Sequence, residues 1–548
     1  MSLLCVSIFV DASGDVPLAI DRAVRAVADG ARIIEWRLDA LAEEPDGLTA
    51  IRRLLAESPA PCIATIRAED EGGTWQGDEQ TRIAILEAIG TGDHPPAYID
   101  LELRAWTRSA NLRQKVRLAI DHASQVRDIS TRLILSSHDF GGRPANLISR
   151  IADMAATDAC TVGKVAYMAR SLRDSLEMFD LVAERVKPMI GLCMGEYGLP
   201  TRILAPKFGG FLTFAAVDDG AATAPGQPTV RELAETYRFH DIGPRTRVYG
   251  VVGHPVGHSL GPTVHNRGFA EAGIDAVYIP MLVAPGWESF KATIGECIDH
   301  RRLDFGGCSV TLPHKEHLLR FGREVGAEID PLAILARAAN TLVVERDADG
   351  GVSGLRVLNT DSVAAVESLA AGLDPSVPPI EALRGRRVAI IGAGGVARAA
   401  AAGLLAHEAE VVIFNRTRTR SENVVRDLRD HGAISVGRTM DELACGCFHA
   451  FVNATPVGMT GGPAADESVL PDDLPLDDSM VVMDTVYTPR ITPMLAIARD
   501  RGARIVDGTA MFVAQAEAQF EAWTGRTPAE DLFASVLASR PGVRPESS

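Results

Sequence analysis

Apolar runs and amphipathic stretches alternate through the first half of the chain. The apolar runs are rich in β-branched residues and cover residues 3–10, 32–39, 61–68, 97–103, 131–139, 160–169, 188–195 and 211–217. Stretches with a helical period lie between them, for example residues 17–29, 79–89 and 171–185. Continuous apolar strands are typical of parallel sheets that are covered on both faces. This alternation predicts an α/β fold that begins with a (β/α)8 TIM barrel.

The second half has a less regular pattern, which predicts a different fold. Strand-like runs cover residues 247–253, 275–283, 306–313 and 339–345. From residue 383 an apolar strand, a glycine-rich turn, an alanine-rich helix and a second strand follow one another, as in a Rossmann unit. A helical period in residues 505–523 predicts a last helix that packs back across the cleft. We expect a barrel in residues 1–240, an α/β substrate-binding domain in 247–362 and 510–540, and a Rossmann-type nucleotide-binding domain in 380–509.

Composition narrows the class of protein. A chain of 548 residues is too long for one hydrophobic core. Its formal net charge of -17 disfavours a nucleic-acid or membrane-surface partner. The start of the chain lacks the features of a signal peptide, and no apolar run approaches the roughly 20 residues of a membrane-spanning helix. The eight cysteines have no metal-site spacing, so we expect a cytoplasmic enzyme without a metal, acting on small molecules.

Barrel enzymes carry their chemistry at the carboxyl ends of the strands. Most of the unusual polar residues of the first half fall there: Glu35, Arg37, Arg67, Glu71, Asp100, Glu102, His138, Lys164, Arg202 and Gln227. Lys164 lies between Val162 and Ala166 in an apolar context, which favours the neutral amine needed to form a Schiff base. A snorkelling lysine at a strand end is the alternative. His138 lies one strand earlier, and because neighbouring strands are ~5 Å apart both side chains can reach one substrate.

Six motifs of the first half carry a family resemblance. EWRLD, TIRAEDEGG, IDLEL, SSHDF, GKVAYMA and TAPGQPT, in this order, resemble type I 3-dehydroquinate dehydratase. The resemblance implies that Lys164 forms an imine with the substrate ketone and that His138 is the general acid and base. It further implies that Glu35 and Glu71 position His138 and the substrate hydroxyls, and that Arg202 binds the substrate carboxylate. The rest of the implied pocket is Arg37, Arg67, Met194, Gln227 and Thr223, the last standing where the family has Ser.

A glycine-rich turn in the second half predicts a dinucleotide site. Gly392, Gly394 and Ala397 fit G-x-G-x-x-A between an apolar strand and an alanine-rich helix. A basic turn follows the next strand where an NAD-selective site would place a carboxylate, and these cations suit the 2′-phosphate of NADP(H). A solvated basic turn is the alternative. The expected cofactor contacts are Gly392, Ala393, Gly394, Gly395, Val396, Ala397, Asn415, Arg416, Thr417, Arg420, Thr455 and Met511.

The motifs HPVGHSLGP, SVTLPHKE, ANTL, NTD, GAGGVAR, NRT, NATPVGM and DGTAMFVAQA together resemble shikimate dehydrogenase. This resemblance implies NADPH-dependent reduction of 3-dehydroshikimate, with Lys315 and Asp361 as the catalytic pair. The implied substrate contacts are Ser259, Thr311, Asn340, Tyr487 and Gln515. The whole chain therefore resembles a bifunctional enzyme with two consecutive reactions of the shikimate pathway.

Three positions depart from the dehydrogenase pattern. Gly261 replaces the second serine of the substrate loop, Ser309 replaces an asparagine, and Ala510 replaces a glycine. Loss of the serine hydroxyl opens space near the substrate carboxylate, so we expect some activity on quinate, which carries an extra hydroxyl there. Two other hypotheses stay open at this stage: a regulatory protein that senses quinate or shikimate, and a Schiff-base aldolase fused to another dehydrogenase.

Overall fold

The computed structural model describes residues 2–127, 130–218, 227–257, 259–445, 447–462, 464–471 and 474–539. The chain forms two compact units. The first contains residues 1–247 with 275–284 and 302–304, and the second contains residues 248–274, 285–301 and 305–548. Among the described residues, no helix is both long and apolar enough to cross a membrane.

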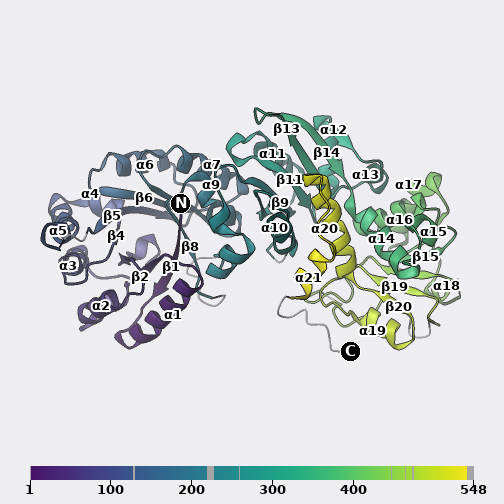
Figure 1. The fold of residues 1–548 in the computed structure, drawn as a ribbon, viewed down its shortest axis with the longest axis horizontal. Helices are drawn as coiled ribbons and strands as arrows, with labels where there is room; N and C mark the ends of the chain where they lie inside the picture. Colours follow the sequence, from purple (N-terminus) through teal and green to yellow (C-terminus); the bar gives the residue numbers. More distant parts are fainter. Residues whose placement is uncertain are drawn as a thin grey trace. The chain divides into compact units, whose positions relative to one another are not determined.

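The first unit contains the predicted barrel (Figure 1). Its parallel strands are β1 (Leu3–Phe9), β2 (Ile33–Arg37), β3 (Cys62–Thr65), β4 (Tyr98–Glu102), β5 (Arg132–Asp139), β6 (Cys160–Met168), β7 (Met189–Met194) and β8 (Leu212–Ala215). They lie in the order β7-β6-β5-β4-β3-β2-β1-β8. The Phe211 amide donates to the Met189 carbonyl at 2.8 Å, which brings the start of β8 to β7 and nearly closes the sheet. The unit also contains β10 (Ala276–Leu282).

Helices surround the barrel strands and bury their apolar faces against them (Figure 1). They are α1 (Val16–Ala28), α2 (Gly47–Ala56), α3 (Glu79–Gly90), α4 (Leu103–Arg108), α5 (Ala110–Arg127), α6 (Leu147–Ala156), α7 (Leu172–Ala183), α8 (Leu199–Ile203) and α9 (Ala205–Phe208). Inside the barrel, each strand contributes one buried side chain near its start to a shared core: Cys5, Ile33, Ile63, Tyr98, Ile134, Val162, Ile190 and Leu212. This layer forms the floor beneath the polar ends of the strands.

The second unit contains a mixed sheet in which β9 (Arg247–Gly253), β11 (Phe305–Val310), β13 (Thr341–Arg346), β14 (Val352–Leu358) and β12 (Glu328–Ile329) are neighbours in this order. The sequence pattern did not predict β12 or β14. Strand β14 pairs antiparallel with β13, and its alternation is obscured because most of its side chains are half-buried or exposed.

A second, fully parallel sheet follows. Its strands are β15 (Arg387–Ile391), β16 (Glu410–Phe414), β17 (Ile434–Val436), β18 (Ala450–Asn453), β19 (Val481–Asp484) and β20 (Arg504–Val506). They lie in the order β17-β16-β15-β18-β19-β20, which is the Rossmann order 3-2-1-4-5-6. In this fold the ligand crevice lies at the carboxyl ends of the first and fourth strands, here β15 and β18. The predicted Rossmann fold is confirmed.

The helices of the second unit are α10 (Gly261–Glu271), α11 (Trp287–Asp299), α12 (Lys315–Val325), α13 (Pro331–Ala336), α14 (Thr360–Leu373), α15 (Pro379–Leu383), α16 (Gly395–Ala406), α17 (Arg418–Leu428), α18 (Met440–Cys445), α19 (Pro493–Asp500), α20 (Gly508–Thr524) and α21 (Leu532–Ala538). Helix α20 returns from the Rossmann sheet to the mixed sheet. There the Trp523 indole donates to the Leu342 carbonyl at 2.9 Å. The prediction that the last long helix packs back in this way is confirmed.

Candidate active sites

Strand periodicity places the polar side chains of the barrel directly above its apolar floor. Side chains two residues apart on a strand point to the same face. Adding two to each floor position therefore gives the next inward layer: Ser7, Glu35, Thr65, Asp100, Ser136, Lys164, Leu192 and Phe214. Most members of this layer are polar, and all are buried. The barrel thus encloses a charged layer at the end where the chemistry was predicted.

Lys164 lies at the centre of this layer. Its Nζ is 2.8 Å from Asp100 Oδ2 and 3.2 Å from Glu35 Oε1, and 4.5 Å from the centre of the Phe214 ring. The expectation of an apolar surrounding for the ammonium was wrong, because carboxylates from β2 and β4 project into the same layer of the barrel. The amine faces these two carboxylates and one aromatic ring above the apolar floor.

The two carboxylates beside Lys164 are held in their charged forms. Burial alone raises the pKa of Asp100, but the nearby Arg67 and Lys164 charges outweigh it and lower the pKa well below its ordinary value. Burial likewise opposes ionisation of Glu35, and Lys164 and Arg37 together lower its pKa. Glu35 Oε1 also accepts from the Thr65 hydroxyl at 3.0 Å, and the Ser7 hydroxyl bonds the other oxygen. The predicted contact of Glu35 with His138 stays a prediction.

His138 pairs with Glu71 at the mouth of the barrel. The ring Nδ1 lies 3.1 Å from Glu71 Oε2, and the His138 amide donates to the same oxygen at 2.9 Å. Burial, followed by the charges of Arg67 and Lys164, lowers the pKa of His138 well below 6.5. Burial raises the pKa of Glu71 to about 7. The neutral forms of both His138 and Glu71 are therefore favoured relative to water. The imidazole is unprotonated at neutral pH and available as a base.

Arg67 links the charged layer to a second row of carboxylates. Its guanidinium lies 2.9 Å from Asp100 Oδ1 and 3.0 Å from Glu102 Oε1, and it donates to Ser136 Oγ at 2.8 Å. Arg82 of α3, also buried, lies 2.7 Å from Glu102 Oε2. This network leaves Arg67 engaged by protein groups, so it orients the layer around Lys164.

Arg202 has a different environment. Its side chain is buried, and its guanidinium donates to the Phe214 carbonyl at 3.3 Å. The described residues place no carboxylate against it, and burial lowers its pKa to about 10. A buried cation without a counter-ion is costly unless an anion arrives. Arg202 is therefore suited to a substrate carboxylate.

The remaining predicted residues of this site lie around its rim. Arg37 pairs with Asp39 at 2.6 Å and lies over the Phe9 ring. Met194 ends β7 and is buried, as is Gln227. Thr223 lies outside the described residues.

The second predicted site is centred on Lys315 and Asp361. Lys315 is the first residue of α12 and Asp361 lies in the first turn of α14, and their Nζ and Oδ2 atoms are 2.5 Å apart. Asn340, just before β13, donates to Asp361 Oδ1 at 2.9 Å and to Thr360 Oγ1 at 3.0 Å. A cation and a carboxylate in direct contact form a pair that can relay a proton.

Four further predicted contacts lie on the elements around this pair. Thr311 follows β11, Ser259 precedes α10, Tyr487 follows β19, and Gln515 lies in α20. Among the described residues, none of the four donates a side-chain hydrogen bond to Lys315 or Asp361. Ser259 Oγ instead accepts from the amide of Gly261 at 3.2 Å. Their predicted roles toward substrate stay predictions.

The glycine-rich turn after β15 has the shape that a pyrophosphate needs. Gly392 has φ +126, and a Cβ there would lie 2.7 Å from the Ala454 carbonyl, so the turn abuts the loop after β18. Gly394 caps α16, and a Cβ on Gly394 or Gly395 would meet no atom within 4 Å. These residues leave open room before a helix N-terminus, which fits a bound phosphate group.

The basic turn after β16 is exposed. Asn415 donates to the Thr417 carbonyl at 2.9 Å, and Arg418 pairs with Glu422 at 2.9 Å. Arg416 and Arg420 form no ion pair with the described residues. On the other side of the crevice, Thr455 bonds Asn453 at 2.7 Å, and Met511 is buried in the first turn of α20. The turn and the Gly-rich loop together fit NADP(H).

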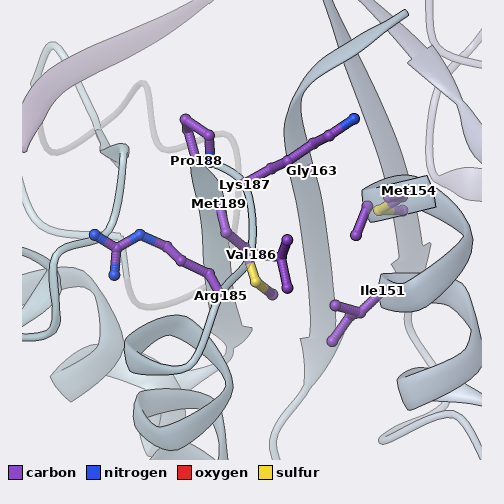
Figure 2. A pocket seen from close by; sticks show the side chains of 9 residues that line it. Ile151, Met154, Gly163, Arg185, Val186, Lys187, Pro188 and Met189 are labelled. Atoms are coloured by element: carbon purple, nitrogen blue, oxygen red, sulfur yellow. The ribbon is translucent and has the colours of Figure 1, made fainter. Parts of the chain in front are cut away.

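A small pocket between the barrel sheet and its surrounding helices does not belong to this chemistry. Figure 2 shows it between α6 and the starts of β6 and β7, lined by Ile151, Met154, Ala155, Gly163, Arg185, Val186, Lys187, Pro188 and Met189. Gly163 faces Met154 of α6, so its neighbour Lys164 points to the opposite face of the strand, into the barrel. The pocket is therefore outside the sheet.

Asp100, Ser136 and Gln519 are functional candidates that the predicted site did not include. Asp100 and Ser136 bond each other at 2.6 Å beside Lys164. The inward period of two from Tyr98 and Ile134 would have found both. Gln519, one turn after Gln515, donates to Thr341 Oγ1 at 3.2 Å. Its helical position gave no signal, because its partner lies far away in the sequence.

Family models match both halves of the chain. A model described as type I 3-dehydroquinase matches residues 4–244. Models described as the shikimate dehydrogenase substrate binding domain, shikimate / quinate 5-dehydrogenase and the shikimate 5'-dehydrogenase C-terminal domain match residues 251–342, 378–444 and 508–537. The order of these matches is the order of the two sites described above.

Relatives match the same arrangement. The chain is 34% identical to a bifunctional 3-dehydroquinate dehydratase/shikimate dehydrogenase, chloroplastic, of Arabidopsis thaliana, over 98% of this chain and 84% of the relative. It is 37% identical to a shikimate dehydrogenase (NADP(+)) of Paramagnetospirillum magneticum, over 54% of this chain and 99% of the relative. A solved structure of dehydroquinate dehydratase and shikimate dehydrogenase from S. pombe AroM is 25% identical, covers 98% of both chains and has a TM-score of 0.43.

Proposed function

The chain belongs to the family of bifunctional 3-dehydroquinate dehydratase/shikimate dehydrogenases, and on this premise we propose that it catalyses two consecutive reactions. The barrel dehydrates 3-dehydroquinate to 3-dehydroshikimate. The second unit reduces that product to shikimate with NADPH. The observation that carries the proposal is that one chain contains both a lysine facing carboxylates inside a barrel and a Lys–Asp pair beside a Rossmann crevice.

In the barrel we propose that Lys164 attacks the C3 ketone of the substrate and forms an imine. The ketone oxygen leaves as water with two protons of the ammonium, and Asp100, 2.8 Å away, stays anionic and stabilises the positive charge of the iminium. His138, neutral at pH 7, removes the C2 proton, and the electrons move into the iminium. The same residue then assists departure of the C1 hydroxyl as water, and hydrolysis releases Lys164. Arg202 binds the carboxylate throughout.

In the second unit we propose that Lys315 and Asp361 handle the proton of the reduction. NADPH, when bound, supplies the hydride. Lys315 donates a proton to the ketone oxygen as the alcohol forms, and Asp361 holds Lys315 in place through their 2.5 Å contact. Gly394 and Gly395 leave room for the pyrophosphate, and Arg416 and Arg420 face the ribose end. Ser259, Thr311, Tyr487 and Gln515 hold the substrate.

The domain boundaries that we propose rest on the three sheets and on the sequence motifs. We propose three domains with the boundaries 1–240, 247–362 with 510–540, and 380–509. Small-molecule substrates are the partners of both sites. A cytoplasmic location and some activity on quinate stay predictions.

A coupled assay tests the proposal. The purified chain, given 3-dehydroquinate and NADPH, should oxidise NADPH, and borohydride added with 3-dehydroquinate should leave a stable adduct on Lys164. Lys164→Ala should abolish both signals and leave NADPH oxidation by 3-dehydroshikimate intact. Lys187→Ala is the matched control, because this lysine lies in the pocket outside the sheet. Absence of any adduct, or loss of both reactions in Lys164→Ala, would count against the proposal.

A further inference from the structure

A buried chain of hydrogen bonds connects α20 to the Lys315–Asp361 pair. Gln519 Nε2 donates to Thr341 Oγ1 at 3.2 Å, and the Thr341 hydroxyl donates to Asn340 Oδ1 at 2.9 Å. Asn340 Nδ2 donates to Asp361 Oδ1 at 2.9 Å. Gln519, Thr341, Asn340 and Asp361 are each at most 3% exposed. The chain therefore runs through a part of the protein where each hydrogen bond is shielded from water.

The amide of Asn340 has no freedom left in this arrangement. Its two Nδ2 hydrogens are used by Asp361 Oδ1 and Thr360 Oγ1. Its Oδ1 accepts from the Thr360 amide at 2.8 Å and from Thr341. An amide offers two donor hydrogens and two acceptor positions, and all are occupied here. Asn340 is thus oriented entirely by its protein neighbours.

The donors of this chain all point toward Asp361. A threonine hydroxyl has one hydrogen, so a Thr341 hydroxyl that donates to Asn340 cannot also donate to the Thr360 hydroxyl 3.5 Å away. Gln519 donates to Thr341 through its amide nitrogen, which leaves the Thr341 hydrogen for Asn340.

We propose that Gln519 is a positioning residue for the reduction: through Thr341 and Asn340 it keeps a donor on Asp361 Oδ1 and so keeps this carboxylate aligned with Lys315. The inference rests on the proposed dehydrogenase function of the second unit. Gln519 touches neither of the reacting groups. Its contribution is to donate a hydrogen bond to Thr341, so that the Thr341 hydroxyl donates to Asn340.

The groups around this series of hydrogen bonds are consistent with its donor direction, from Gln519 toward Asp361. At its far end His265 of α10 hydrogen-bonds Gln519, and burial lowers the pKa of His265 to about 3, so the ring stays neutral. Among the described residues, Lys315 of α12 forms the ion pair with Asp361. Asn340 donates to the other carboxylate oxygen and also to the Thr360 hydroxyl. One oxygen of Asp361 thus faces the lysine, and the other faces the amide that the hydrogen-bond chain orients.

The test replaces the hydrogen-bond donor of Gln519 by an acceptor while keeping the shape of the side chain. Gln519→Glu replaces the amide with an acceptor, and Thr341→Val removes the hydroxyl while keeping the volume. For both variants we expect the turnover rate of the reductase reaction to fall about ten-fold, equivalent to about 1.4 kcal/mol, with the KM of its substrate little changed. Thr341→Ser keeps the hydroxyl and should restore the native turnover rate.

Two measurements on the same samples separate this inference from misfolding. Dehydratase activity reports the barrel, and the dissociation constant of NADPH reports the Rossmann fold, and neither should change. A native turnover rate in both variants would overturn the inference. So would a loss of turnover that comes with a raised KM or that Thr341→Ser fails to restore, since either result indicates a merely structural role. If the unmodified chain does not reduce 3-dehydroshikimate, the proposed function itself fails.

Discussion

Asp100 bridges Lys164 and Arg67: its Oδ2 lies 2.8 Å from the lysine nitrogen and its Oδ1 lies 2.9 Å from the Arg67 guanidinium. One buried carboxylate therefore contacts two buried cations, each of which has a second carboxylate partner, Glu35 for Lys164 and Glu102 for Arg67. This relationship explains how the barrel tolerates a lysine in its interior. It also distinguishes buried charges that are paired within the protein, such as Asp100, from a buried charge that is available to substrate, Arg202.

Asp100→Asn should strongly destabilise the barrel. Removing the carboxylate leaves two buried cations with less compensation, which costs about 3 kcal/mol of unfolding free energy. Calorimetry at pH 7 measures the loss. The matched control is Asp70→Asn, because Asp70 forms a partly exposed pair with Arg104 and should cost less than about 1 kcal/mol. Equal effects of the two substitutions would contradict the role assigned to Asp100.

The pH dependence of dehydration should report Glu71 and His138 separately. Because the pKa of Glu71 is raised to about 7, its ionisation should give an inflection near pH 7 in kcat/KM, which Glu71→Gln removes. Because the pKa of His138 is lowered well below 6.5, the remaining acidic limb should lie below pH 6.5. A limb at or above pH 6.5 in Glu71→Gln would contradict this assignment.

The same two shifts affect folding with a definite sign. Glu71 binds its proton more tightly when folded, so its contribution to stability falls as pH rises from 4.5 to about 7. His138 binds its proton less tightly when folded, so its contribution falls as pH drops below 6.5. Chemical denaturation across this range should therefore show Glu71→Gln gaining stability relative to the native chain as pH rises.

Arg202→Met should weaken substrate binding without lowering the free energy of unfolding. The buried guanidinium has no carboxylate partner among the described residues, so its removal should leave the unfolding free energy unchanged or higher. Loss of the charge-assisted contacts to a carboxylate should raise the KM of the dehydratase substrate about 100-fold. Arg185→Met is the control, because Arg185 bonds the Val182 and Phe208 carbonyls. An unchanged KM in Arg202→Met would show that the carboxylate binds elsewhere.

The sequence predicted helices and strands better than it predicted which side chains contact each other. Continuous apolar runs indicated the barrel strands, and the barrel rule that chemistry lies at the carboxyl ends of strands singled out Glu35 and Lys164. The contact between Lys164 and Asp100 was not predictable from either strand alone, since it depends on how the side chains of different strands meet inside the barrel. The half-exposed β14 was missed because its own side chains show no clear alternation. Gln519 was missed because its partner Thr341 is 178 positions away.

Cofactor selectivity should depend on two exposed arginines. Arg416→Ala and Arg420→Ala should each raise the KM of NADPH about ten-fold and leave the KM of NADH unchanged, because only NADPH carries the 2′-phosphate. Arg418→Ala is the matched control, since Arg418 pairs with Glu422 on its own helix. Steady-state kinetics with both cofactors measures the effect. Equal losses with NADPH and NADH would place the 2′-phosphate away from this turn.

Substrate range should depend on Gly261, the buried first residue of α10. Its amide donates to Ser259 Oγ, so the loop keeps one hydroxyl beside the predicted carboxylate site and lacks the second. Restoring it with Gly261→Ser should add a hydrogen bond and fill the space available to the extra hydroxyl of quinate. The ratio of kcat/KM for quinate to that for shikimate should then fall about ten-fold, corresponding to roughly one lost buried polar contact. Oxidation of both substrates with NADP+ by the native chain and the variant measures the ratio, and dehydratase activity controls for folding. If the ratio does not change, Gly261 does not set the substrate range, and the extra hydroxyl of quinate must be accommodated or excluded by another part of the site.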